Sequence, residues 1–276
     1  MVAKLSTNLA TKEGSGDDSY LVIRKYQKTQ YAPGGSTNRE EYMPKIPTIS
    51  ACCFNEEHEI LVVSFADCDI KLFRLKGMSQ KDQLDIDHIP KSYNGQFICN
   101  NIALGLHQAT HEFIGIFVGS GQMHVVNLHP ESHKFMEVLT KIQLPMKKRL
   151  SSDPNSNMNE QPELATSINF DENIGTFVTF YTGFFKVFEP ILFRETLTQE
   201  CQSNLEDAKG RKPGEAPKRE ISITCSDLSK KSHVLAIGGH QGNIKFFDAT
   251  SKTFFDNDSD IHHSEMMSLF FFDEEA

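Results

Sequence analysis

Tryptophan is absent from this 276-residue sequence, whereas phenylalanine occurs 21 times. Long apolar runs are absent as well, because no segment approaches the roughly 20 apolar residues with which a helix spans a bilayer. Residues 1–20 lack the continuous apolar core of a secretory signal. These absences predict a soluble protein that is not inserted in a membrane and stays in the cytoplasm.

Positive charge is scarce. Lysine and arginine total 28 against 37 aspartate and glutamate residues, so the formal net charge is −9 and the pI is near 5.7. A broad surface for nucleic acid or for anionic lipid needs a concentrated positive field. The charge therefore argues against nucleic acid as a partner.

Paired cysteine motifs are missing too. The six cysteines follow neither a Cys-x-x-Cys pattern nor a compact disulfide framework. A free cysteine packs as a small hydrophobic residue, and a reducing compartment keeps it free. We therefore expect structural thiols and no cofactor at Cys52, Cys53, Cys68, Cys99, Cys201 and Cys225.

The sequence does contain a unit that repeats. Residues 234–248 (VLAIGGHQGNIKFFD) combine an apolar strand, a glycine-bearing turn and a second apolar strand. Related text occupies residues 60–73, 113–126 and 174–188, and another apolar segment precedes each copy. A recurring unit of this kind indicates a repeat architecture.

Two positions recur in all four copies. The first closes the third apolar segment and is Phe73, Val126, Phe188 or Phe247. The second lies in the preceding turn and is Cys68, Gly121, Gly183 or Gly242. We expect two-residue hairpins there, because such turns require positive φ, which costs glycine least. Cys68 would be strained in the same turn.

Over residues 46–276 this period resembles the WD40 repeat, whose copies form the blades of a β-propeller. The resemblance implies an all-β fold with four antiparallel strands in each blade. The inner and middle strands of a blade are covered by its neighbours, so they read as apolar runs. What the resemblance implies about function is a scaffold that holds other proteins.

The copies depart from the family pattern. Asp67 holds the place of the turn Asp, but Ser120, Thr182 and Gln241 replace it later. Phenylalanine stands where the family usually has tryptophan, and it cannot donate the indole hydrogen bond. The aromatic-Asp pair survives only at Phe247 and Asp248, and the matching positions hold Arg74, Asn127 and Glu189. We therefore expect the polar network of each blade to be largely missing.

The domain layout follows from the spacing of the copies. Phe73, Val126, Phe188 and Phe247 are 53, 62 and 59 residues apart, whereas a compact WD40 repeat has roughly 40–45 residues. We place loop insertions at residues 146–163 and 202–219, where charged, Pro, Ser, Asn and Gly residues gather. The predicted blades are 46–95, 96–145, 164–201 and 220–262, with an opening strand at 263–276 and a flexible tail at 1–45 that carries a strand at 20–26.

About four blades and one opening strand do not close a ring. WD40 propellers commonly have seven blades, and an open edge exposes unpaired backbone groups. Two explanations remain open. Either the chain is part of a longer propeller, or a partner chain completes it.

No catalytic motif stands out. The pairs His107/His111 and His129/His133 have the spacing of metal ligands on a helix, but they fall in turns between predicted strands. Residues 238–242 are glycine-rich yet lack the Lys and the helix of a phosphate loop. We predict neither an enzyme nor a metal site.

The basic residues 147–149 precede Ser151 and Ser152, as in sites of basophilic kinases. We predict possible phosphorylation there, which would reverse the sign of the loop.

Three functions compete on this frame. The first is a non-catalytic scaffold of a cytoskeletal, ciliary or trafficking assembly. The alternative is a phosphoinositide-binding propeller of the autophagy type, because residues 167–173 and 182–190 look similar to the first blade of that family. The paired-Arg lipid motif of that family is missing from this chain. The third is an enzyme with acidic or His residues around a central channel.

Overall fold

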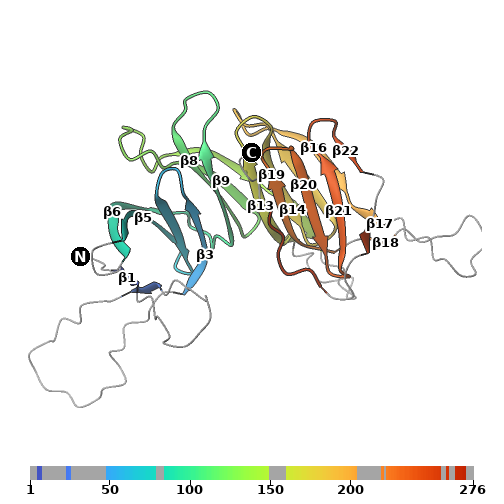
Figure 1. The fold of residues 1–276 in the computed structure, drawn as a ribbon, viewed down its shortest axis with the longest axis horizontal. Coiled ribbons are helices and arrows are strands. Elements are labelled where there is room, and N and C mark those ends of the chain that lie inside the picture. The colour runs from blue at the N-terminus through green and yellow to red at the C-terminus, as the bar shows by residue number, and fades with distance from the viewer. Residues whose placement is uncertain are drawn as a thin grey trace, which may run out of the picture. The chain divides into compact units, whose positions relative to one another are not determined.

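The computed structural model describes residues 5–7, 23–25, 48–78, 84–148, 160–203, 219–220, 222–255, 259–260 and 265–271. Within these ranges every regular element is a β-strand, and all strand pairs are antiparallel (Figure 1). The chain divides into two compact units, residues 1–98 and 99–276. The expected division at residues 45 and 46 lies inside the first unit. No helix in the described ranges is long and apolar enough to cross a membrane.

The first unit contains one four-stranded sheet. Its strands are β3 (Ile49–Asn55), β4 (Ile60–Phe65), β5 (Asp69–Met78) and β6 (Leu84–Asn94), paired in chain order. Every residue of β4 is buried, which accounts for a sequence that is apolar except for Ser64. Within the expected tail, β1 (Leu5–Thr7) pairs with β2 (Ile23–Lys25), so β2 falls inside the strand expected at 20–26.

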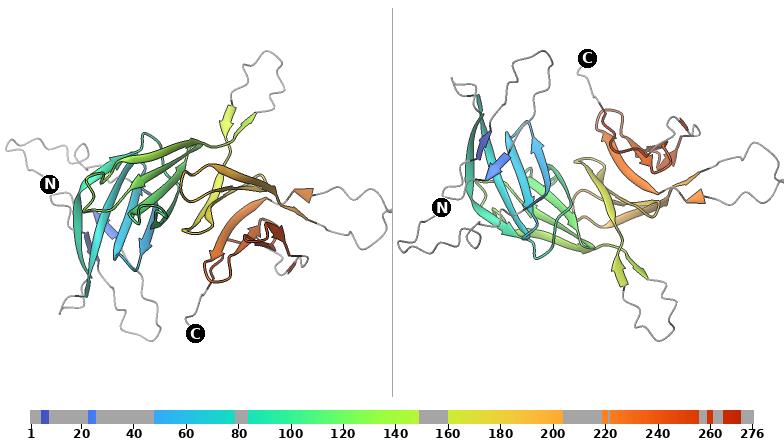
Figure 2. Two further views of the ribbon diagram at one scale, coloured as in Figure 1. Left: turned by 90° about the horizontal axis from the view of Figure 1, so that it is seen from above. Right: turned by 90° about the horizontal axis from the view of Figure 1, so that it is seen from below.

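The second unit contains three such sheets, each a meander in chain order (Figure 2). The first sheet has β7 (Asn101–Leu106), β8 (Phe113–Gly119), β9 (Gln122–Asn127) and β10 (Val138–Gln143). The second sheet has β13 (Ala165–Asp171), β14 (Gly175–Phe180), β15 (Phe184–Phe188) and β16 (Glu195–Glu200). The third sheet has β19 (Ile223–Ser229), β20 (Val234–Gly239), β21 (Asn243–Asp248) and β22 (Thr253–Phe254), with β23 (Ser259–Asp260) also beside β21.

These three sheets of the second unit pack through their first strands. β13 lies against both β7 and β19. One core cluster joins the first two sheets and includes Ile116, Val178 and Phe188. A second cluster, which includes Phe177 and Ile237, joins the second sheet to the third. The second sheet is therefore covered on both faces.

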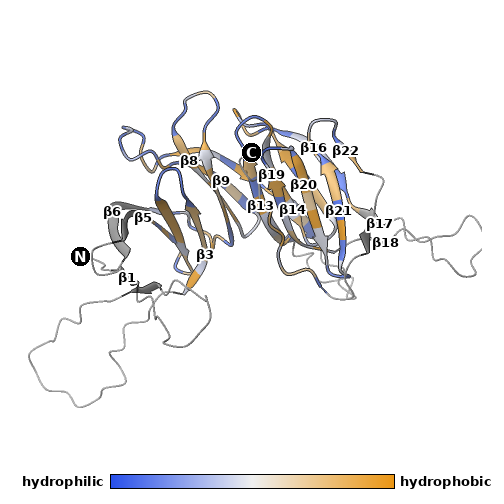
Figure 3. Cartoon of the chain, in the orientation of Figure 1, coloured by the Kyte–Doolittle hydropathy of each residue, from blue (hydrophilic) through white to orange (hydrophobic). Residues whose placement is uncertain are grey.

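The second strands are the most buried part of each sheet, as their apolar sequences predict. Every residue of β8 and β14 is buried, and so are five of the six residues of β20. The coloration of Figure 3 shows β20 as mostly hydrophobic. Phenylalanine rings fill the spaces between the sheets: Phe185 meets Phe247 at 4.9 Å, and Phe247 meets Phe254 at 5.3 Å, both edge to face.

Both expected insertions begin and end as short ladders. β11 (Met146–Lys148) pairs with β12 (Glu160–Pro162), and β17 (Gln202–Ser203) pairs with β18 (Arg219–Glu220). The sequences of these stretches show no apolar periodicity, so the ladders could not be predicted from them. The residues enclosed by each ladder, including Ser151 and Ser152, lie outside the described ranges.

The opening strand expected at residues 263–276 is wrong for its described part. Residues 265–271 form no ladder with any strand of the described ranges. They lie along β19 instead, where Thr224 Oγ1 donates to the carbonyl of Met266 at 2.5 Å.

The turn after each second strand has the expected sign of φ and, in three cases, an unexpected length. φ is +76° at Gly121, +93° at Gly183 and +82° at Gly242, and Cys68 also adopts +69°. Only Ser120–Gly121 is a two-residue turn, whereas the other three loops have three residues. The prediction of two-residue hairpins is therefore wrong at these three sites. A left-handed residue in third position is typical of the longer loop.

Gly175 opens β14 with φ +127°, and a Cβ built there would lie 2.0 Å from the carbonyl oxygen of Phe188. We expect Gly175→Ala to lower the free energy of unfolding by about 3 kcal/mol or more, because both the backbone and the neighbouring strand must move. Asn173→Ala is the matched control in the same turn, since Asn173 is exposed and contributes its backbone N–H. Urea denaturation of both variants measures the difference. Equal stability would contradict the prediction.

Candidate functional site

The sheets of the second unit have two kinds of turn end. We call the polar end the one that carries the turns after the first and third strands. We call the cavity end the one that carries the turns after the second strands, together with the β11–β12 ladder. The two ends differ in chemistry.

At the polar end a side chain caps every first turn. The acceptor is the last residue of the first strand or the residue after it, and the donor is the backbone N–H three positions on. The pairs are Asp171 with Ile174 at 3.1 Å, Ser229 with Ser232 at 3.1 Å and His107 with Thr110 at 3.3 Å. In the first unit Asn55 caps His58 in the same way at 2.9 Å.

A second set of caps closes the third turns. Asp248 accepts from Thr250 N at 2.8 Å, Asn127 from His129 N at 2.9 Å, and Glu189 from Leu192 N at 2.8 Å. Asn127 and Glu189 thus supply acceptor oxygens at the positions where the Asp of the aromatic-Asp pair is missing. These caps are local to their turns and are distinct from the polar network across each blade that was expected to be largely missing. An amide or a longer carboxylate offers the same acceptor oxygen.

The caps shift the acidity of the carboxylates. The hydroxyl of Ser251 and two backbone N–H groups lower the pKa of Asp248 below its usual value. Burial would raise the pKa of Glu189, but three backbone donors and Arg194 outweigh it, so the pKa is lowered. The hydrogen bond from Ser132 lowers the pKa of Glu112, whose other oxygen accepts from Asn127 at 2.8 Å. All three groups serve as ionised acceptors.

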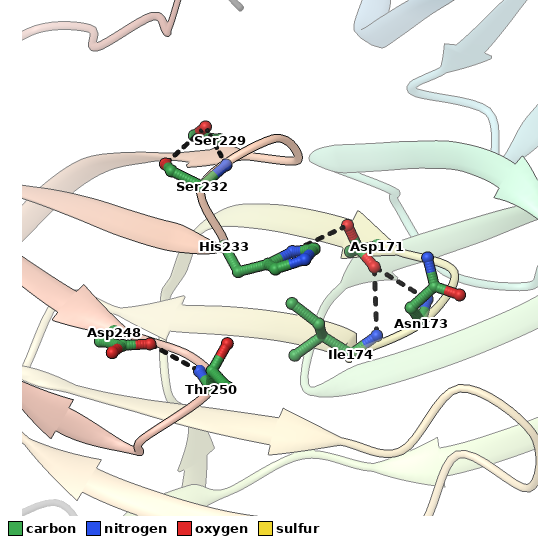
Figure 4. A network of polar contacts seen from close by, with 8 residues as sticks. All are labelled: Asp171, Asn173, Ile174, Ser229, Ser232, His233, Asp248 and Thr250. Atoms are coloured by element: carbon green, nitrogen blue, oxygen red, sulfur yellow. Dashed lines mark hydrogen bonds and ion pairs between the residues drawn. The ribbon is translucent and has the colours of Figure 1, made fainter.

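One contact of the polar end joins two sheets. Figure 4 shows Asp171 of the second sheet beside His233 of the third sheet, with His233 Nδ1 3.8 Å from Asp171 Oδ2. The other oxygen of Asp171 accepts from Asn173 N and Ile174 N. The carboxylate of Asp171 is buried, whereas the His233 side chain is 38% exposed, so the pair links the two turns at the edge of the solvent.

The histidine pairs do not assemble a metal site in the structure. His107 uses its ring for the carbonyl of Ile191, 3.0 Å away, and for the hydroxyl of Thr110. The described ranges contain no group of three His, Cys, Asp or Glu side chains that could hold a metal ion. Burial raises the pKa of the Cys201 thiol to about 12 and also raises that of Cys225, which keeps both thiols protonated.

The cavity end holds a cavity of about 310 Å³ between the first two sheets. Val118 and Leu144 are buried in its wall, and residues 119–121 and 161–165 supply most of the rest. Gly121 shapes it, because a Cβ there would lie 2.9 Å from Pro162. Its carbonyl accepts from Leu144 N at 2.8 Å.

Apolar side chains are exposed around this cavity. Leu164 lines it and is 56% exposed, and Tyr181, which donates its backbone N–H to the carbonyl of Leu164, is 39% exposed. Met146 is 38% exposed, with its sulfur close to Gly121. We call Met146, Leu164 and Tyr181 the apolar rim. The carboxylate of Glu163 adds an acceptor and already receives the hydroxyl of Thr182 at 3.0 Å.

The predicted signature residues are structural and do not meet in one site. Phe73, Val126, Phe188 and Phe247 are at most 3% exposed and occupy equivalent positions on third strands. Asp67 lies in an exposed turn of the first unit and accepts from Asp69 N. The sequence patterns did not predict the apolar rim or the first-turn caps. A small polar residue closing each first strand was the available signal for the caps.

No protein-family model matches this chain, and no curated protein matches it. Among solved structures, the chain is similar to one described as the crystal structure of the computationally designed Ika4 protein. The two share 18% identity with a TM-score of 0.41, over 64% of this chain and 82% of the other. A likeness at this level carries no argument about fold or function.

A cluster of hydroxyl groups joins β13, β14 and β19. Ser167 Oγ lies 2.6 Å from Ser226 Oγ and 2.8 Å from Thr179 Oγ1. Thr166 also reaches Thr179 Oγ1 at 3.0 Å. On the same strand, Thr176 is equally buried, but its Oγ1 has no hydrogen-bond partner among the described residues.

These two threonines give a matched pair. We expect Thr179→Val to lower the free energy of unfolding by about 1–2 kcal/mol, because it removes a bonded hydroxyl from a buried cluster. We expect Thr176→Val to leave stability unchanged or raise it by up to about 1 kcal/mol, because it removes an unsatisfied one. Chemical denaturation of both variants checks the order, and the reverse order would contradict it.

His124 makes the fold sensitive to acid. Burial, with a smaller contribution from Lys141, lowers the pKa of His124 from 6.5 to about 4. Between pH 6.5 and pH 4, His124 is therefore protonated in the unfolded chain but neutral in the folded chain. The free energy of unfolding falls as the pH drops below 6.5 and levels off near pH 4. The loss at pH 5 is about 2 kcal/mol.

We expect His124→Gln to reduce the loss of stability between pH 7 and pH 5 by about 2 kcal/mol. His133→Gln, at an exposed position, should leave that loss unchanged. Unfolding curves recorded at pH 7 and pH 5 give both differences. A native pH dependence in the His124→Gln variant would show that another group is responsible.

Proposed function

We propose that the four sheets are blades of a WD40-like β-propeller and that the protein is a non-catalytic interaction scaffold of the cytoplasm. Three features of the second unit support the proposal: consecutive four-stranded meanders, packing through first strands, and the same turn caps in every sheet. The sheet of the first unit has the same strand order and the same first-turn cap. The ring would be completed by the rest of a longer propeller or by a partner.

The observation that carries the scaffold function is the cavity beside the apolar rim. Binding sites on proteins combine a concave, mostly apolar surface with a few fixed polar groups. Here Val118 and Leu144 give the apolar wall, and Glu163 gives a polar group held by Thr182. The frame around it is rigid, because buried second strands and capped turns hold both flanking sheets.

A partner that fits is an extended protein segment with one large apolar side chain. The cavity volume of about 310 Å³ accommodates such a side chain, and buried apolar anchors dominate the binding energy of protein interfaces. The apolar rim would cover the flanking residues of the segment. Lys147 is exposed beside the rim and would favour a nearby acidic residue.

The test uses two leucines that are equally exposed. Leu164 at the rim and Leu192 at the polar end are both 56% exposed. We expect Leu164→Glu to lower the recovered amount of at least one protein that co-purifies with the full chain by about tenfold or more. A tenfold change represents about 1.4 kcal/mol, and a charge buried in the interface costs more than that. Leu192→Glu should leave the same protein unchanged. Quantitative mass spectrometry after affinity purification from native cells measures both.

The melting curves of both variants serve as the folding control. Loss of the partner with Leu192→Glu but not with Leu164→Glu would contradict the assignment of the cavity end. Flotation of the full chain with phosphoinositide vesicles, but not with vesicles lacking them, would favour the alternative lipid-binding function over the scaffold.

A further inference from the structure

Residues 265–271, which we call the C-terminal segment, lie on the third sheet where β20 ends and β19 begins. The backbone N–H of Met266 donates to the carbonyl of Gly239 at 3.3 Å, and that of Phe271 donates to Asp227 Oδ2 at 2.6 Å. His240 Nδ1 lies 3.3 Å from Glu265 Oε2 at the start of the segment. The segment is thus anchored at both ends.

Gly238 permits the close approach of this segment. A Cβ at Gly238 would lie 3.0 Å from Met266 Cβ and 3.3 Å from Leu269 Cδ1. Met266, Leu269 and Phe271 are partly buried. Between them Met267 is 81% exposed and Phe270 is 76% exposed.

The second and third sheets show how a segment in such a place is normally covered. Ile223, at the start of β19, donates its N–H to the carbonyl of Tyr181 at the end of the second sheet, much as Met266 does to Gly239. β19 is then paired along its length with the antiparallel, buried β20, as β13 is paired with β14. Within the described ranges, no backbone hydrogen bond joins residues 267–270 to another residue.

We propose that the C-terminal segment is the docking site for an antiparallel apolar strand of a partner polypeptide, which pairs with residues 266–271 and covers Met267 and Phe270. The proposal rests on the proposed function, because it treats the segment as the first strand of a further blade. β14 and β20 define the chemistry of the occupant: six mostly apolar residues, nearly all buried and paired in antiparallel register. Such strand addition satisfies the free backbone groups and buries the two side chains.

The probe is a synthetic peptide of residues 234–248, which contains a strand of this chemistry and its own hairpin. With the full chain, we expect the peptide to slow amide exchange of residues 267–270 by about tenfold or more, since paired strand amides are protected. The double variant Met267→Glu/Phe270→Glu should weaken peptide binding by about tenfold or more. Phe255→Glu, at a 48% exposed residue of the same sheet, should leave binding unchanged.

Mass-spectrometric labelling of Cys225 shows whether the segment stays docked in each variant, because Cys225 is buried and its sulfur lies 3.6 Å from the carbonyl of Met266. A scrambled peptide controls for non-specific association. Unchanged exchange at residues 267–270 overturns the proposal. A dimer of the chain that the double variant dissolves also overturns it, because the occupant is then a second copy.

The two proposals can fail separately. Protection of residues 267–270 without any Leu164-dependent partner would overturn only the scaffold site at the cavity end. A Leu164-dependent partner without protection would overturn only the strand-docking site.

Discussion

The burial of each second strand on both faces is the constraint on which the second unit depends. A strand such as β14 can be buried throughout only if a sheet covers each of its faces, and the first and third sheets provide this cover through their own apolar strands. The first strands bring the sheets into contact, and hydroxyl groups of Ser167 and Ser226 bond across that junction at 2.6 Å. Each sheet is therefore stable only as part of a row, which is the physical meaning of the sequence repeat.

The packing of these sheets explains why the chain does not need tryptophan. Phe185, Phe247 and Phe254 pack edge to face between the second and third sheets, so ring contacts supply the cohesion there. The turns do not depend on the third-strand aromatic residue. Asp171, Asn127 and Glu189 each bond to backbone N–H groups within a few residues. Local caps and apolar contacts together thus replace a polar network that would cross the sheet.

The sequence predicted the four sheets well and their edges poorly. Second and third strands were recognisable because burial makes their apolar runs continuous. Gly183 and Gly242 were recognisable as turn residues because the turn requires positive φ, which favours glycine in the sequence. Fourth strands such as β10 and β16 alternate between exposed and partly buried residues and carry many polar side chains, so their signal resembled loops. The apolar rim could not be predicted, because Leu164 and Tyr181 are brought together by pairing across 17 positions of the chain rather than by local pattern.

The row also explains why interaction surfaces arise where they do. The second strands are covered by neighbouring sheets, and most large exposed apolar residues described in the second unit lie at turn ends or beside the third sheet, although Leu139 of β10 is also 37% exposed. Leu164 and Tyr181 occupy the first kind of place, and Met267 and Phe270 the second. The two proposed sites differ in what they would bind: the turn end with a cavity would accept one side chain of a partner, whereas the unpaired segment would accept a backbone. Under the proposed function, the chain would hold two partners by independent chemistries.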